Sequence, residues 1–143
     1  MAAAAGTSDR MLIYHFGNKD ALVGELLDYL AVQMAEQLDD ILPPTKFESE
    51  AVLIAKVMDL MRSEDFQPYI RIWLDIVSAA AQGAKTHQKS GRAIIEVYLD
   101  WIALRHPEAE RAPATLTLIE GMLVMDAVGQ KQVSDAVISR LEK

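Results

Sequence analysis

Apolar residues recur every three to four positions along most of this chain, and prolines and glycines interrupt the pattern. The clearest stripe lies in residues 20–42 and consists of Leu22, Leu26, Leu30, Met34, Leu38 and Leu42. This spacing places the side chains on one face of an α-helix, which Pro43 and Pro44 then end. No segment has the alternating pattern of a β-strand. The sequence therefore predicts an all-α fold.

The same reasoning predicts the rest of the fold. We expect further helices over 46–63, 66–82, 91–106, 113–129 and 130–141. The polar stretch 84–90 is predicted to be a connection, and the charged stretch 108–112 is predicted to be a connection or a short extra turn.

Composition limits the class of protein. The chain has 143 residues, no cysteine and a formal net charge of −7, so disulfides and thiolate chemistry are absent. No apolar run approaches the roughly 20 residues of a membrane span, and Met1–Ala5 lacks the features of a signal peptide. We expect a cytoplasmic protein that does not bind a membrane.

Residues 5–22 contain a second pattern. Ala5-Gly6 can end one helix, Thr7 or Ser8 can cap the next, and Gly17-Asn18 separates that short helix from the long one. Two helices joined by a tight turn are typical of a helix-turn-helix, whose second helix enters the DNA major groove. Residues 9–15 are then a candidate recognition helix.

These residues resemble the TetR family of bacterial transcription regulators. The matched residues are Ala5-Gly6-Thr7-Ser8, Tyr14-His15-Phe16 and the run from Gly17 to Leu22. Ile13 departs from the pattern, because the family usually has an aromatic residue there. The family's first helix and most of its second are not in this sequence, so we expect the N-terminus to be incomplete by about 40 residues, judged from the resemblance alone.

The resemblance implies a partial DNA-binding head with its connecting helix in residues 1–42 and a ligand-binding and dimerisation domain in residues 43–143. It implies operator DNA as a partner. The expected DNA contacts are Thr7, Ser8, Arg10, Met11, Tyr14, His15 and Lys19.

The family also implies a pocket for a small apolar effector among the middle helices. Methionine and aromatic side chains suit such a wall. The candidates are Met58, Met61, Phe66, Trp73, Tyr98, Trp101 and Met122. The alternative for each of them is ordinary core packing.

The run from Leu118 to Ala127 resembles the family's penultimate helix, which pairs with a partner subunit together with the last helix. We expect a homodimer interface made by Leu118, Gly121, Met125, Val133, Val137 and Leu141. Gly121 inside a helix favours close approach of another backbone. The alternative is a contact within the chain.

We find no pattern typical of a catalytic, cofactor or metal site, since His15, His87 and His106 are scattered. The predicted function is a dimeric, ligand-responsive transcription regulator, a repressor released from DNA by its effector. One alternative is a helical dimeric ligand-binding module that has lost DNA binding. Another is a monomeric carrier of apolar ligands.

Overall fold

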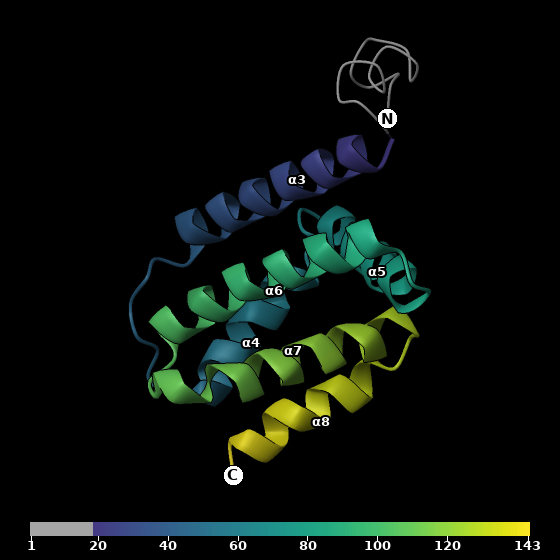
Figure 1. The fold of residues 1–143 in the computed structure, drawn as a ribbon. Helices are drawn as coiled ribbons and strands as arrows, with labels where there is room; N and C mark the ends of the chain where they lie inside the picture. Colours follow the sequence, from purple (N-terminus) through teal and green to yellow (C-terminus); the bar gives the residue numbers. More distant parts are fainter. Residues whose placement is uncertain (1–18) are drawn as a thin grey trace.

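The computed structural model describes residues 19–143, and these form six α-helices with no β-strand. The elements are α3 (Lys19–Ile41), α4 (Glu50–Met61), α5 (Gln67–Ala81), α6 (Lys85–Arg105), the 3-10 helix η1 (Ala109–Arg111), α7 (Ala112–Ala127) and α8 (Lys131–Leu141) (Figure 1). The all-α prediction is confirmed for this part of the chain. The predicted recognition helix lies outside the described residues.

The second predicted helix begins later than expected, at Glu50 instead of residue 46. Ser49 has an extended backbone, and its hydroxyl accepts a hydrogen bond from the Val52 N–H at 3.2 Å, which caps the helix. The residues before the cap are held by α6 instead. The Phe47 N–H donates to the Arg105 carbonyl at 2.8 Å, and Lys46 Nζ donates to the His106 carbonyl at 2.8 Å.

The polar stretch 84–90 was predicted to be a connection, but residues 85–90 form the first turns of α6. Tertiary packing gives the reason: Ser90 is buried, and a Cβ added at Gly91 would lie 3.6 Å from Ile76 Cγ2 of α5. Close contact with a neighbouring helix thus stabilises a helical segment whose own residues show no apolar stripe.

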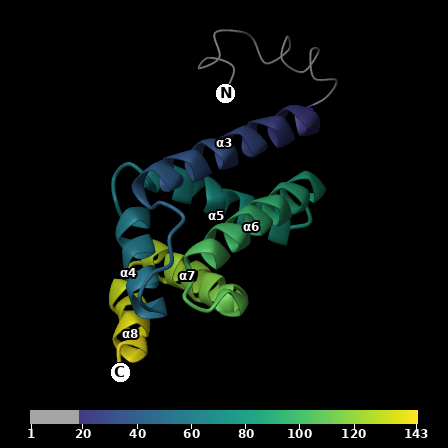
Figure 2. The same cartoon turned by 90° about the vertical axis from the view of Figure 1, so that its left-hand side faces the viewer.

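The helices are stacked in layers (Figures 1 and 2). α5 and α6 form one helical hairpin, α7 and α8 form another, and α4 packs against α7 and α8. α3 lies across α6 on the other side of the molecule. The start of α3 and the end of α8 are therefore at opposite ends of the fold (Figure 2).

Two apolar clusters stabilise this arrangement. The larger one joins α4, α6 and α7 around fully buried side chains such as Leu53, Ile54 and Met58. The smaller one joins α3, α5 and α6 through Leu27, Ile76 and Ile94. None of the helices between residues 19 and 143 has the length and hydrophobicity needed to cross a membrane.

A polar network connects α4 to the α7–α8 hairpin. Arg62 Nε and Nη2 donate to the two carboxylate oxygens of Asp126 at 2.7 and 3.0 Å, and Nη1 donates to Asp135 at 2.9 Å. Ser134 Oγ lies 2.7 Å from Asp126 Oδ1. Burial alone would raise the pKa of Asp126, but the hydrogen bonds from Arg62 and Ser134 lower it below its usual range.

Replacing Asp126 should destabilise the fold. Asp126→Ala removes a bidentate ion pair and leaves Arg62 partly buried with one carboxylate partner, so we expect a loss of about 2–3 kcal/mol in the free energy of unfolding. Asp135→Ala, the matched control at a half-exposed carboxylate, should cost less than about 1 kcal/mol. Urea denaturation at neutral pH measures both.

The stabilisation from Asp126 should also depend on pH. Its folded-state pKa is depressed, so the contribution is present above the ordinary Asp pKa of about 3.9 and is lost as the pH falls through the folded value. Equal stabilities of D126A and wild type at neutral pH would contradict this account.

Candidate ligand-binding cavity

A cavity lies at the centre of the described fold, between α3 on one side and α5, α6 and α7 on the other. Its wall is almost entirely apolar and comes from five helices. The lining residues are Leu27, Leu30, Ala31, Met34 and Leu38 of α3, Val57 and Met61 of α4, Tyr69, Ile70, Ile72, Trp73 and Ile76 of α5, Ile94, Tyr98, Trp101 and Ile102 of α6, and Leu116, Ile119, Glu120 and Leu123 of α7.

The cavity measures about 80 Å³. An engineered cavity of about 150 Å³ in another protein accepts benzene, so a ligand with a ring would have to displace side chains here. Met34 and Met61 both line the wall. Their unbranched side chains can change rotamer at low cost, which suits a site that adapts to its ligand.

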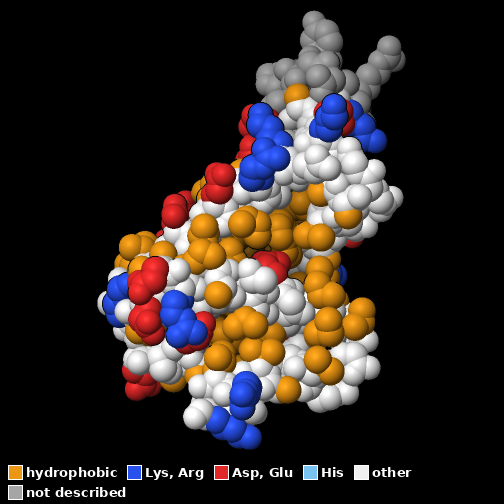
Figure 3. Space-filling view, turned by 60° about the horizontal axis from the view of Figure 1, so that its bottom comes forward, with side chains coloured by type: hydrophobic (Ala, Val, Ile, Leu, Met, Phe, Trp, Pro, Cys, Tyr) orange, Lys and Arg blue, Asp and Glu red, His pale blue; other side chains and the backbone are white. Residues whose placement is uncertain are grey.

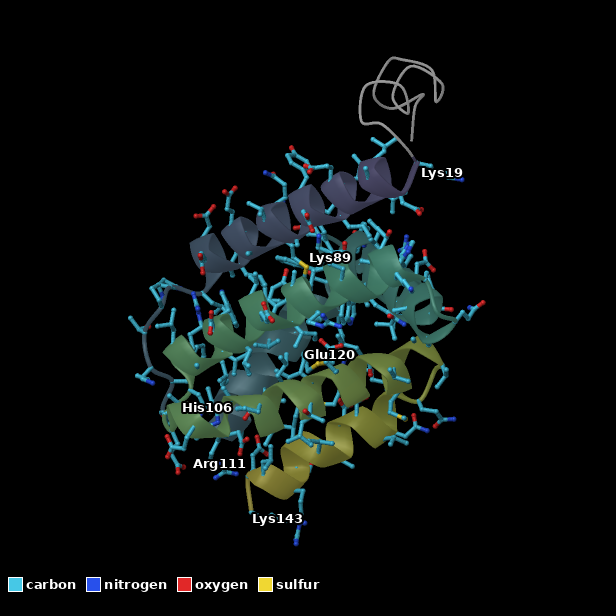
Figure 4. The ribbon with its side chains drawn as sticks, viewed as in Figure 1. Lys19, Lys89, His106, Arg111, Glu120 and Lys143 are labelled. Carbon is cyan, nitrogen blue, oxygen red and sulfur yellow. The ribbon has the colours of Figure 1, made fainter. Side chains whose placement is uncertain are left out.

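Glu120 is the single formally charged residue among the lining residues. It points from α7 into the bundle (Figure 4), and its Oε2 accepts a 2.6 Å hydrogen bond from Trp73 Nε1 of α5. Burial raises the pKa of Glu120, and the Trp73 hydrogen bond opposes this shift. An acidic group thus stands in an apolar wall without a cationic side chain beside it in the lining.

Two tyrosine hydroxyls accompany this carboxyl group. Tyr98 Oη is buried and has no hydrogen-bond partner among the described residues. Burial raises the pKa of Tyr98, and the negative charge of Glu120 adds to the shift. Tyr69 Oη accepts a hydrogen bond from Gln37 Nε2 of α3 at 3.2 Å. Because an unpaired buried hydroxyl is costly, the Tyr98 group is suited to pair with a bound molecule.

A polar cluster beside the cavity is built around Arg105, whose side chain is fully buried and contacts Trp101 of the cavity wall. The guanidinium donates to the Leu42 carbonyl through Nη2 at 2.6 Å and to Asp39 Oδ1 at 2.8 Å. Asp39 Oδ1 also accepts a hydrogen bond from Trp101 Nε1 at 2.9 Å. The guanidinium carbon lies 3.8 Å from the centroid of the Trp101 ring. The cluster fastens the end of α3 to α6.

A wider cleft between α3 and α5 shares Leu30, Tyr69 and Ile72 with the cavity. The cleft also contains two acidic residues, Asp40 and Asp65, and its lining includes no lysine, arginine or histidine. The shared residues place it beside the cavity, and Gln37 and Tyr69 form a hydrogen bond across it. This cleft therefore adjoins the cavity, and the formally charged residues in its lining are both acidic.

The structure brings four of the seven residues predicted for the pocket to the cavity wall, namely Met61, Trp73, Tyr98 and Trp101. It places Met58, Phe66 and Met122 in the main core, almost without exposure to solvent. Sequence reasoning did not identify Glu120, although an acidic residue within the apolar run 118–125 was a usable signal.

The residues predicted for a dimer interface lie on α7 and α8. Gly121 is exposed, and a Cβ added there would meet nothing within 4 Å, so no contact within the described chain explains this glycine. Val133 is also exposed, and Leu118, Met125, Val137 and Leu141 are half-buried. Their neighbours Val124 and Val128 are 45% and 67% exposed. Hydrophobic side chains are prominent on the face that α7 and α8 present (Figure 3).

Of the predicted DNA contacts, Lys19 is exposed at the start of α3. Thr7, Ser8, Arg10, Met11, Tyr14 and His15 lie outside the described residues. The structure adds a feature that the sequence reasoning missed. The first turns of α6 carry exposed Lys85, Lys89 and Arg92 with no acidic residue between them, and a Cβ added at Gly24 of α3 would lie 3.6 Å from Thr86 Cγ2. These basic residues therefore lie near the start of α3.

Comparisons of the chain with protein families, curated proteins and solved structures give no match. No group of three or more histidine, aspartate or glutamate side chains within residues 19–143 is arranged to bind a metal ion. The resemblance to the TetR family therefore depends on the residues quoted from the sequence.

Removing the charge of Glu120 should change how stability depends on pH. In Glu120→Gln the amide oxygen can still accept the Trp73 hydrogen bond. The folded-state pKa of Glu120 is raised, so wild type loses stability relative to E120Q as the pH rises from the ordinary Glu value of about 4.3 through the folded value. Urea denaturation between about pH 4 and pH 8 measures this difference. The control Glu96→Gln changes an exposed carboxylate of α6, so its free energy of unfolding should stay close to that of wild type at every pH. If the free energies of unfolding of E120Q and wild type differed by the same amount at every pH, the burial effect would be refuted.

Proposed function

We propose that this chain is a ligand-responsive transcription regulator that binds operator DNA as a homodimer and is released by a small, largely apolar effector. The support comes from three features. They are a helix that lines the cavity and directly follows the N-terminal motif, an exposed apolar face on α7 and α8, and the exposed basic residues of α6 that lie near the start of α3. Repression is the simplest form of this mechanism, since effector and DNA then oppose one another.

The observation that carries the proposal is the position of α3. Five of its residues, from Leu27 to Leu38, line the cavity, and its first residue, Lys19, directly follows the 5–18 stretch that resembles a DNA-binding motif. A ligand in the cavity would touch the same helix that leads into this motif. Binding of effector and of DNA would then be coupled through α3, and the coupling would act equally in both directions.

The apolar face supports a two-fold dimer. Thr117, Gly121, Val124 and Val128 are exposed along one side of α7, and Val133 extends the surface onto α8. A two-fold interface brings the same surface of two subunits together, so a glycine at its centre allows two helices to approach closely. A dimer would also present two DNA-binding motifs to successive half-sites.

Dimerisation should be sensitive to a large charged residue at Gly121. Gly121→Arg has open space in the monomer, so the fold should persist while the interface is blocked. We expect sedimentation equilibrium to show a dimer for wild type and a monomer for G121R, with unchanged helical circular dichroism. Val77→Arg, at an exposed valine of α5, is the control and should remain dimeric. A wild-type monomer, or a G121R protein that stays dimeric, would exclude this interface.

DNA binding is tested best with paired lysine variants. Lys19 and Lys89 lie toward the end of the molecule where α3 starts, whereas Lys143 lies at the opposite end (Figure 4). If Lys89 contacts a phosphate, Lys89→Glu should weaken binding to all sequences and lower the slope of log affinity against log salt by about 1. Lys143→Glu should leave both unchanged.

The measurement uses duplexes covering the DNA upstream of the chain's own coding region. It is made with the 143-residue chain and with the same chain extended by any codons in frame before it. Salt-dependent binding supports the regulator. If both forms are dimers and neither binds these duplexes, the dimeric ligand-binding module is the better account.

A further inference from the structure

We propose that the central cavity selects lipophilic cations, such as protonated amines with a compact apolar body, through the Glu120 carboxylate and the Tyr98 hydroxyl. The proposal rests on the proposed function in taking the cavity as the effector site, and it goes further by naming the chemical class of the effector. It follows from the cavity wall, from its two unusual polar groups and from the cleft beside it.

The formal charge of the cavity wall is negative. Among the residues that line the cavity, Glu120 is the single formally charged one, and none is lysine, arginine or histidine. A ligand carboxylate or phosphate would find no cation in this wall and would face the Glu120 carboxylate. A cationic ligand would neutralise a carboxylate that is otherwise mostly surrounded by apolar side chains, which makes the pair favourable in a medium of low polarity.

Two oxygen atoms at the cavity have unused hydrogen-bonding capacity among the described residues. Trp73 donates to Oε2 of Glu120, and no described hydrogen bond involves Oε1. Tyr98 Oη is buried without a partner. A protonated amine has N–H donors for both oxygens, because the tyrosine hydroxyl can accept while the carboxylate accepts the charged hydrogen bond.

Four aromatic side chains contribute to the cavity wall. Tyr69, Trp73, Tyr98 and Trp101 all line the cavity, and the faces of such rings attract cations. Arg105 already lies over the Trp101 ring at 3.8 Å. The rings of Tyr69, Trp73 and Tyr98 show no such cation contact in the described part of the chain.

The cleft beside the cavity is acidic. The cleft between α3 and α5 contains Asp40 and Asp65 and shares three residues with the cavity. Negative charge around an entrance raises the local concentration of cations and lowers that of anions. The acidic cleft and the adjoining cavity thus favour the same class of ligand.

The test uses three probes of nearly equal shape, namely benzylammonium, benzyl alcohol and benzoate, and the ring of each enters by displacing flexible side chains of the wall such as Met34 and Met61. Both tryptophans of the chain, Trp73 and Trp101, line the cavity, so intrinsic fluorescence reports binding and calorimetry measures its affinity. We expect benzylammonium to bind at least about tenfold more tightly than benzyl alcohol, and benzoate not to bind.

Variants then assign the preference to Glu120. Glu120→Gln should remove the advantage of the amine over the alcohol while the alcohol still binds, which also shows that the variant is folded. Tyr98→Phe should weaken amine binding without abolishing it. The control Glu96→Gln removes the same charge from an exposed carboxylate, so it should behave like wild type.

Other outcomes overturn the proposal. Equal binding of all three probes, a preference for benzoate, no binding of any probe at millimolar concentration, or an amine preference that survives in E120Q would each reject cation selection by Glu120. None of these results changes the DNA-binding and dimerisation measurements, so failure of this inference is distinguishable from failure of the proposed regulator.

Discussion

The buried guanidinium of Arg105 fixes the C-terminal end of α3 to α6, and the cavity depends on α3. Arg105 donates hydrogen bonds to carbonyls at the end of α3 and within α6, and it pairs with Asp39. Burial lowers its pKa and the Asp39 carboxylate opposes the shift, but an arginine side chain stays charged in a protein. Such a charge must be fully paired when it is buried. The end of α3 is thereby fixed to α6, and the wall that α3 contributes is fixed with it.

α7 connects two surfaces that would otherwise be independent. Its inner side places Leu116, Ile119 and Glu120 in the cavity wall, and its outer side exposes Gly121 and Val124. Glu120 and Gly121 are neighbours in the sequence, so a displacement of the backbone at one position also displaces the other. A helix that is apolar on more than one side thus serves both the cavity and the exposed face on which the proposed dimer depends.

The sequence predicted the helices whose apolar stripes are regular, such as α3 with its break at Pro43, because periodic burial is a local signal. It did not predict the start of α6, where packing of Ser90 and Gly91 against α5 replaces an apolar stripe. Trp73 and Trp101 were each named as candidates for a pocket wall and both line the cavity, but Glu120 and Asp39 were not expected beside them, since a single acidic residue in a helix usually faces water. Which methionines line the cavity, and which fill the core, is decided by helix packing that sequence spacing does not specify.

The anchoring of α3 at one end has a mechanical consequence. With a rise of about 1.5 Å per residue, Leu30 in the cavity wall is about 13 Å along the helix from Asp39, and Lys19 is about 30 Å from it. If α3 pivots as a rigid rod about its fastened end, a displacement at Leu30 becomes slightly more than twice as large at Lys19. The Asp39–Arg105 pair is then the pivot of α3, and a small displacement of the helix beside a bound molecule becomes a larger displacement at its N-terminal end.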